Sequence, residues 1–293
     1  MSQLIDVPFR KMNGLGNEFV ILDLRGNRQA RPTEQDAIAL ANPATGPGCD
    51  QLITIEDARS KADDAFMGIW NADGSAAGAC GNAARCVAHI LMSETGADTV
   101  RLDSPSGPLR AWQAPVGPGG EQVRVDMGKP KFGWRDIPLS EQVEDTRFLD
   151  VKLGPIDAPV LWGPSGVNIG NPHCVFFVKD VNAHAIDRFG PMIEHHPLFP
   201  ERVNVSIVEA RDRRRLRVRV WERGAGLTKA CGTGACAALV AANRRRLVDR
   251  VATVELDGGP LRIEWADDDH VYMTGPVAYE FEGIVEARHL GGS

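Results

Sequence analysis

Two cysteines, Cys80 and Cys231, stand in the same local setting about half a chain apart. Each follows a glycine-rich stretch and is followed directly by a glycine, Gly81 or Gly232. Each also opens a run that is rich in alanine, lacks proline and predicts a helix. The first turn of a helix carries unpaired N–H groups and the positive end of the dipole. We therefore expect both thiols to have a lowered pKa, and the amides beside them to bind a carboxylate. The two predicted helices span residues 80–92 and 231–243.

The other cysteines are predicted to pack in the core. They are Cys49, Cys86, Cys174 and Cys236. On a helix that turns 100° per residue, Cys86 lies about 240° around from Cys80, and Cys236 about 140° around from Cys231. Neither pair of cysteines shares a helix face, so two cysteines of one helix are not expected to bind the same metal ion. The sequence also has no CxxC pair, which is typical of a zinc module. A single cysteine of this kind is most often a packing residue. Its recurrence in both halves favours chemistry for Cys80 and Cys231.

The chain contains an internal repeat. Short blocks recur in the same order about half a chain apart, which indicates a duplication. The matched blocks are 16–17 with 170–171, 51–56 with 204–209, 70–84 with 221–235, 107–110 with 259–262, and 127–128 with 274–275. We predict an N-terminal half over 1–130 and a C-terminal half over 131–276, with the active site in the cleft between them. Residues 277–293 are predicted to pack back onto the first half.

The hydrophobic pattern within each half predicts a mixed fold. Residues 215–221 alternate polar and apolar side chains, which is the period of a half-buried strand. Short β-rich runs bounded by turn residues predict further strands at 19–22, 52–55, 174–178, 251–256 and 261–265. The two helices are more apolar than surface helices usually are, so we expect both to be buried. The predicted fold class is α/β (α+β), with two pseudo-symmetric domains that each wrap a mixed β-sheet around a central buried helix.

Two acidic thiols on opposite faces of one carbon atom suit the inversion of a stereocentre. One thiolate removes a proton from one face, and the other thiol delivers a proton to the opposite face. Amide donors at the helix starts would stabilise the carbanion that develops beside a carboxylate. The sequence shows no evident lysine for pyridoxal phosphate and no metal cluster to act as an electron sink. The residues alone therefore favour a cofactor-independent amino-acid racemase or epimerase.

Polar side chains also recur at matched turns. The matched pairs are Asn17 with Asn171, Gln51 with Asn204, and Asn71 with Glu222. Amides offer both donors and acceptors, as recognition of a zwitterion requires, although asparagine in a glycine-rich turn can also serve the backbone alone. Arg223 follows Glu222 and could hold a second carboxylate in a bidentate manner. His173 follows Asn171 and Pro172 and could assist a thiol.

Composition and charge narrow the class of protein. The 293 residues include 33 Lys and Arg and 39 Asp and Glu, which gives a net charge of −6. The length favours two domains, and a hydrophobic share of 43% supports a sizeable core. We expect a cytoplasmic protein that binds no membrane, because neither a signal-peptide pattern nor an apolar run of membrane-spanning length is evident. Nucleic-acid binding is not expected, because the net charge is acidic and the arginines of 211–219 alternate with apolar residues on one strand.

Seven ordered segments resemble the diaminopimelate epimerase family. They run from about Phe9 to about Gly283 and include both cysteine motifs. The segments are 11–17 (KMNGLGN), 50–52 (DQL), 71–75 (NADGS), 79–86 (ACGNAARC), 170–174 (GNPHC), 201–204 (ERVN), and 222–226 (ERGAG) leading to 230–236 (ACGTGAC).

The resemblance implies interconversion of LL- and meso-2,6-diaminopimelate in bacterial lysine and cell-wall precursor synthesis, without a cofactor or a metal. It implies Cys80 and Cys231 as the catalytic thiols, with His173 and Glu222 beside them, and a homodimer. The substrate contacts that it implies are Asn17, Gln51, Asn71, Gly81, Asn82, Asn171, Asn204, Glu222, Arg223, Gly232 and Thr233. Three positions depart from the family pattern: Asn13 stands for a common histidine, Ala83 for a glycine and Leu227 for an acidic residue.

Other functions remain open at this stage. The nearest is another enzyme of the same fold, such as a proline racemase, a hydroxyproline dehydratase or an isomerase of small unsaturated acids. The polar set around Asn71, Asn171 and Arg223 favours a substrate with a distant ammonium and carboxylate over an apolar imino acid. A redox or metal-binding protein, which belongs to another class of function, could also use the cysteines. Activity that requires a reductant, together with the absence of bound metal, would exclude a metal-binding or disulfide-based function.

Overall fold

The computed structural model describes residues 2–27, 29–78, 80–155 and 157–290. Ala79, which opens one of the family-like segments, and residues 291–293 of the predicted returning segment lie outside the described residues. The chain divides into two compact units. The first contains 1–125 and 274–293, and the second contains 126–273.

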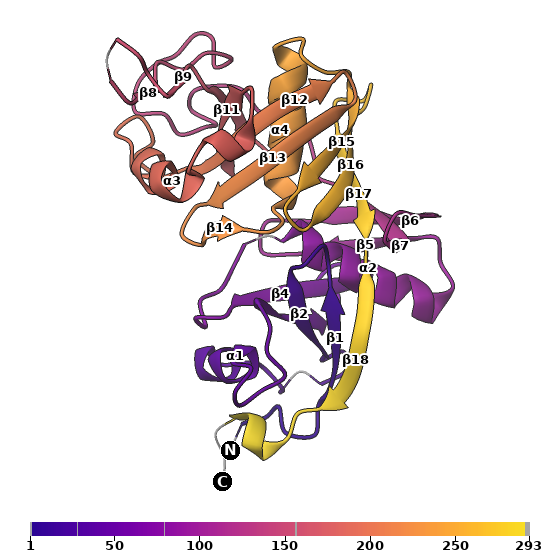
Figure 1. The fold of residues 1–293 in the computed structure, drawn as a ribbon. Coiled ribbons are helices and arrows are strands. Elements are labelled where there is room, and N and C mark those ends of the chain that lie inside the picture. Colours follow the sequence, from indigo (N-terminus) through magenta and orange to yellow (C-terminus); the bar gives the residue numbers. More distant parts are fainter. Residues whose placement is uncertain (1, 28, 79, 156, 291–293) are drawn as a thin grey trace. The chain divides into compact units, whose positions relative to one another are not determined.

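Unit 1 is a mixed sheet with two α-helices (Figure 1). Its strands follow the order β18-β1-β2-β3-β4-β5-β6-β7. Neighbouring strands are antiparallel except for β2 with β3 and β4 with β5, which are parallel. The elements are β1 (Pro8–Asn13), β2 (Glu18–Asp23), α1 (Glu34–Ala41), β3 (Gln51–Glu56), β4 (Ala65–Asn71), α2 (Gly81–Thr95), β5 (Thr99–Asp103), β6 (Leu109–Gly117), β7 (Gly120–Asp126), β18 (Ala278–Ile284) and the 3₁₀ turn η2 (Ala287–Leu290).

Unit 2 repeats this plan. Its main sheet has the order β10-β11-β12-β13-β15-β16-β17, with β14 paired to β13. The elements are β8 (Lys152–Leu153), β9 (Leu161–Trp162), β10 (Ser165–Asn168), β11 (Pro172–Val178), η1 (Val181–Ala183), α3 (Ile186–Glu194), β12 (Asn204–Asp212), β13 (Arg215–Glu222), β14 (Gly226–Thr228), α4 (Gly232–Arg244), β15 (Val251–Leu256), β16 (Gly259–Trp265) and β17 (Val271–Pro276). The pairs β11–β12 and β13–β15 are parallel, as β2–β3 and β4–β5 are in unit 1.

The internal repeat is also seen in the strand registers, where residues at matched positions of the two units form equivalent cross-strand pairs. Leu52 pairs with Trp70 in unit 1, and Val205 pairs with Trp221 in unit 2. Phe19 pairs with Gln51, as His173 pairs with Asn204. The predicted strands are confirmed at every one of the runs named above.

Each unit has a helix buried against its sheet. Helix α2 packs on β5 and β6, and α4 packs on β10, β11, β12, β13, β15 and β16. Nearly every residue of α4 from Gly232 to Ala242 is buried, and α2 is buried from Asn82 through Val87. Both predicted helices are confirmed, and both begin one residue after the cysteine. The alanines among these positions allow the sheet to approach the helix closely.

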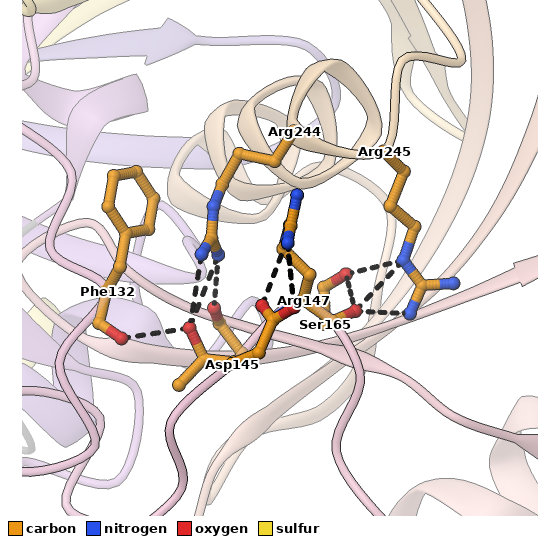
Figure 2. A network of polar contacts seen from close by, with 8 residues as sticks. Phe132, Asp145, Arg147, Ser165, Arg244 and Arg245 are labelled. Carbon is orange, nitrogen blue, oxygen red and sulfur yellow. Dashed lines mark hydrogen bonds and ion pairs between the residues drawn. The ribbon is translucent and has the colours of Figure 1, made fainter.

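Two arginines at the end of α4 fasten the segment that precedes β10 (Figure 2). Arg245 donates to the Arg147 carbonyl at 3.0 Å and to Ser165 Oγ at 2.8 Å. Its guanidinium also stacks over Phe148 and Phe177, with centroid distances of 4.3 and 4.8 Å. Burial lowers the pKa of Arg245 to about 10. These contacts fix the end of α4 that lies opposite Cys231.

The arginines of the β12–β13 hairpin are engaged by acidic neighbours. Arg211 pairs with Glu255, Arg213 with Asp249, Arg215 with Asp212, and Arg217 with Asp257. The stretch is therefore an ion-paired strand surface. Over the described part of the chain, no helix combines the length and apolar character that a membrane crossing requires.

Candidate active site

Cys80 is the N-cap of α2. Its backbone is extended, with φ −148° and ψ 105°, and its Sγ accepts the backbone N–H of Ala83 at 3.4 Å. The thiol also contacts the Oδ1 of Asn17 at 3.9 Å. Cysteine here takes the place of the serine or aspartate that commonly caps a helix, because its sulfur can accept the same N–H. The sulfur is therefore held at the positive end of the helix.

The side chain of Asn17 is oriented by its neighbours. Its Nδ2 donates to Asp50 Oδ2 at 2.9 Å, and the same carboxylate oxygen accepts the Glu18 N–H at 2.8 Å. The Asn17 oxygen then faces Cys80 and accepts from Asn82 Nδ2 at 3.5 Å. The structure thus brings together three of the predicted residues, and Asp50 fixes which way the amide of Asn17 points.

Asn82 is buried at the first turn of α2. Its Oδ1 accepts from Arg85 Nη1 at 2.9 Å, and Arg85 is itself fully buried. Arg85 Nε donates to the carbonyl of Pro276 at 3.3 Å. A buried arginine therefore links the helix start to the segment by which the chain returns to unit 1.

Gln51 and Asn71 form a second polar pair in unit 1. They lie opposite each other on β3 and β4, and Gln51 Nε2 donates to Asn71 Oδ1 at 3.0 Å. Asn71 Nδ2 in turn donates to Ser75 Oγ at 3.0 Å. The Oε1 of Gln51 is buried and has no hydrogen-bond partner among the described residues. This pair therefore leaves one buried acceptor unsatisfied.

Cys231 occupies the same position in unit 2. It is the N-cap of α4, with φ −115° and ψ 108°, and its Sγ accepts the Gly234 N–H at 3.3 Å. Thr233 Oγ1 lies 3.5 Å from the sulfur. Gly234 is required here, because an added Cβ would lie 2.9 Å from Val220 Cγ2. The two predicted thiols thus share one local geometry.

Glu222 contacts the Cys231 thiol. Its Oε1 accepts the Thr228 hydroxyl at 2.6 Å, and the carboxylate is also hydrogen-bonded to Cys231. Burial raises the pKa of Glu222, although both hydrogen bonds oppose that shift. Thr228 lies on β14, which pairs with β13 and so places its hydroxyl against the end of that strand.

The predicted lowering of the thiol pKa is wrong for Cys231. Burial raises the pKa of this thiol well above its usual range, and the neighbouring Glu222 carboxylate raises it further. The hydrogen bonds from Thr233 and Gly234 act in the opposite direction but are outweighed. Desolvation in the folded unit penalises the thiolate more than the end of the helix stabilises it. The raised pKa therefore favours the protonated form of the Cys231 thiol near neutral pH.

His173 and Asn171 extend the network around Cys231. His173 Nε2 lies 2.8 Å from Asn171 Oδ1, and Asn171 Nδ2 donates to Thr233 Oγ1 at 3.3 Å. Burial lowers the pKa of His173 to about 3, so the ring is neutral at ordinary pH. Its Nδ1 is buried without a hydrogen-bond partner among the described residues. The histidine reaches the thiol through Asn171 and Thr233 rather than directly.

Asn204 and Arg223 are joined to each other. Asn204 Oδ1 accepts the Arg223 N–H at 2.9 Å, and its Nδ2 donates to the Pro172 carbonyl at 2.9 Å. The Arg223 guanidinium donates to the Glu201 carbonyl at 3.1 Å and is otherwise exposed. Asn204 therefore shapes the turn, whereas the Arg223 side chain is accessible to a ligand.

Some residues that orient this site were not predicted from the sequence. Asp50 lies within a family-like segment but was given no role, and Thr228 carries no local sequence signal. The predicted contacts Gly81 and Gly232 are the first residues of α2 and α4. Within the described ranges, no three His, Cys, Asp or Glu side chains are grouped so as to hold a metal ion. Cys86, Cys174 and Cys236 are buried as predicted, and Cys49 is partly buried.

Comparison with known proteins places the chain in a family. A sequence model described as diaminopimelate epimerase matches residues 9–133 and 166–280. A diaminopimelate epimerase from Nitrobacter hamburgensis is 51% identical over 287 residues, which cover 98% of this chain and 97% of the relative. One from Rhodopseudomonas palustris is 50% identical over 294 residues, covering 100% of this chain and 98% of the relative.

A solved structure shares the fold at low sequence identity. It is a probable proline racemase from Agrobacterium radiobacter, with a TM-score of 0.67 and 15% identity over 97% of this chain and 95% of that one. This likeness bears on the fold alone, and it confirms the predicted fold class. The family match and the near 50% identity over the full length decide the identity: the chain belongs to the diaminopimelate epimerase family of isomerases.

Proposed function

We propose that this protein interconverts LL- and meso-2,6-diaminopimelate by proton transfer between two thiols, Cys80 and Cys231. The observation that carries the proposal is their common geometry: each sulfur caps a buried helix and accepts an N–H three residues ahead. Each also belongs to a network that contains a matched asparagine, Asn17 or Asn171. Two equivalent thiols are what a reversible inversion needs, because each must act as base in one direction and as acid in the other.

The proposed step conserves the proton count. The thiolate of one cysteine takes the α-proton of the substrate, and the C–H electron pair remains on the α-carbon. The thiol of the other cysteine then donates its proton to the opposite face of that carbon, so that the thiolate and thiol have exchanged roles. Cys231, whose pKa is raised, is the proton donor when Cys80 begins as thiolate. The reverse direction starts from the other state of the enzyme, with Cys231 as thiolate and Cys80 as thiol. Between turnovers, the Glu222 carboxylate that contacts Cys231 passes the Cys231 proton to solvent while Cys80 takes one up.

The substrate's reacting end is assigned to the two helix starts. The backbone N–H groups of Gly81 in α2, and of Gly232 and Thr233 in α4, lie in first turns where such donors have no partner within the helix. We assign them to the α-carboxylate, where they also stabilise negative charge as the carbanion forms. These N–H groups therefore bind the α-carboxylate of the substrate in the ground state, and they bind it more strongly in the transition state, when further negative charge develops beside it. No cofactor is needed in this scheme.

The substrate's distal end is assigned to exposed or unsatisfied polar groups. The Arg223 guanidinium is exposed and suits a distal carboxylate. The buried Gln51 Oε1 lacks a partner among the described residues and suits an ammonium group. Asn71 orients Gln51, and Asn204 orients Arg223. This arrangement favours diaminopimelate over an apolar imino acid such as proline, which has neither distal group.

A homodimer is proposed through β18. This strand pairs with β1 and ends the strand order of unit 1. Its Tyr279, Phe281 and Ile284 are 52%, 45% and 54% exposed. An exposed apolar edge strand is a template for pairing, and two copies related by a twofold axis would cover it. Sedimentation of a Phe281→Glu variant as a monomer would support this interface, and an unchanged dimer would refute it.

A cytoplasmic location is proposed from the chemistry. Both cysteines must stay reduced to exchange protons, and thiols persist in the reducing cytoplasm. The biosynthetic role implied by the family agrees with this compartment.

Single substitutions of the thiols test the proposed function. Cys80→Ala and Cys231→Ala should each lower the rate of diaminopimelate epimerisation by about a thousandfold, as expected for loss of an acid or base. Cys49→Ala, which alters a partly buried cysteine that caps no helix, is the control. Normal epimerisation by either variant, or faster turnover of L-proline than of diaminopimelate by the wild type, would refute the proposal.

A further inference from the structure

Glu194 is a buried carboxylate at the last residue of α3. Its side chain is 4% exposed, and its two oxygens accept from different parts of one turn. Oε2 accepts the Trp221 indole N–H at 2.7 Å, and Oε1 accepts the Gly224 backbone N–H at 3.0 Å. The Arg202 guanidinium lies 3.6 Å from Oε1. The two residues that donate to this carboxylate, Trp221 and Gly224, lie on either side of Glu222 and Arg223 in the chain.

The packing of α3 against this turn makes the contact possible. Gly190 lies one turn before Glu194, and an added Cβ there would lie 2.4 Å from Trp221 Cγ. The absence of a side chain at Gly190 lets the indole ring lie against the helix. The indole N–H then reaches the carboxylate at the helix end. α3 thus serves as a support for the end of β13.

Glu194 acts together with two other anchors of the same turn. Asn204 Oδ1 accepts the Arg223 N–H at 2.9 Å, and the Glu201 carbonyl accepts from the Arg223 guanidinium at 3.1 Å. Glu194 is the one of these that holds the turn on both sides, at Trp221 and at Gly224. Loss of the Glu194 carboxylate would therefore remove the side-chain contacts that hold the turn at Trp221 and at Gly224.

We propose that Glu194 is a positioning residue that sets where Glu222 and Arg223 stand relative to Cys231. This inference rests on the proposed function, in which Glu222 accepts the proton of Cys231 and Arg223 binds the distal carboxylate of the substrate. Glu194 itself touches neither reacting group. It acts by fixing the backbone that carries both, so its substitution should raise KM through Arg223 and lower kcat through Glu222.

The chemistry of the contact requires a carboxylate. Both partners are N–H donors, so both side-chain oxygens must accept. Glutamine has the same shape but one oxygen only, and its NH₂ group would face one of the two N–H groups without a hydrogen bond. A mispaired buried donor is costly, and the turn is expected to move away from it. Removing the indole N–H as well would relieve that conflict.

The test compares Glu194→Gln, Trp221→Phe and the double variant with the wild type. Glu194→Gln should lower kcat/KM for diaminopimelate by about ten- to fiftyfold, the loss expected for one mispaired buried group. Trp221→Phe removes one donor and leaves the carboxylate on Gly224, so it should lower kcat/KM by only a few-fold. The double variant should recover to within a few-fold of Trp221→Phe, because the glutamine oxygen can then accept from Gly224 alone. Glu141→Gln, the same change at an exposed site in the same unit, is the matched control.

The outcomes separate this inference from the proposed function. A wild type that does not epimerise diaminopimelate refutes the proposed function. An active wild type with Glu194→Gln within twofold of its kcat/KM refutes the positioning role. Recovery in the double variant supports that role, because a merely structural loss would make the double variant worse than either single one. Failure of the double variant to recover, with normal melting temperatures for all three, also refutes it.

Discussion

Replacement of His173 should change how the stability of the protein depends on pH. The ring is fully buried, and burial lowers its pKa from 6.5 to about 3. In the unfolded chain the same ring takes up a proton below about pH 6.5, whereas the folded protein keeps it neutral down to about pH 3. The unfolded state therefore binds more protons across this window, and folding stability falls as the pH is lowered through it.

The size of the effect follows from the shift. Each pH unit within the window costs about 1.4 kcal/mol, so wild type should lose about 2 kcal/mol from this ring between pH 6.5 and about pH 4.5. His173→Gln has no imidazole and should not show this loss, although its stability at neutral pH is expected to be lower because a buried contact to Asn171 is disturbed. Carboxylates that titrate in the same range are present in both proteins and cancel in the difference.

Urea denaturation at both pH values measures the two slopes. The gap between the unfolding free energies of wild type and His173→Gln should narrow by about 2 kcal/mol on acidification. His195→Gln removes an exposed imidazole and controls for the loss of a histidine as such. Parallel curves for wild type and His173→Gln would show that His173 takes up its proton in the folded protein, and the account of a neutral buried ring would fail.

Further predictions concern the residues that orient the site and fasten α4. Thr228→Val removes the hydroxyl that donates to Glu222 and should lower kcat by about tenfold with little change in the melting temperature. Asp50→Asn, measured by steady-state kinetics, should lower kcat/KM by about tenfold, because the Asn17 amide loses its acceptor and can rotate away from Cys80. Arg245→Met should lower the free energy of unfolding by about 2–3 kcal/mol in chemical denaturation, since it loses the bonds to Arg147 and Ser165; unchanged stability would refute its fastening role. Normal kinetics in the first two variants would show that neither residue orients the site.

Local sequence signals predicted the framework of both units. The alanine-rich runs after Cys80 and Cys231 predicted two buried helices, and the alternation of 215–221 predicted β13. These features depend on neighbours within a few residues, so a local pattern specifies them. The internal repeat predicted the common strand plan for the same reason, because duplicated sequence folds in the same way.

Features that depend on distant neighbours were not predictable. Thr228 and Glu222 meet because β14 folds back on β13, and Glu194 meets Trp221 because α3 packs on that strand. The raised pKa of Cys231 has the same origin: the helix start is a local feature, but burial is a property of the whole unit. The departures from the family pattern at Asn13 and Ala83 find local uses. Asn13 Oδ1 accepts the Gly16 N–H at 2.6 Å. Ala83 donates the backbone N–H that the Cys80 sulfur accepts as N-cap of α2.

The origin of the proton in the product tests the two-thiol account most directly. LL-diaminopimelate is incubated with the enzyme in D₂O, and both isomers are analysed by mass spectrometry early in the reaction. With two thiols on opposite faces, the removed proton stays on one sulfur while the other delivers deuterium. The meso product should then carry one deuterium at the inverted carbon while the remaining substrate carries none. A meso product that retains the substrate's own proton would show that one group serves both faces, and it would contradict the account.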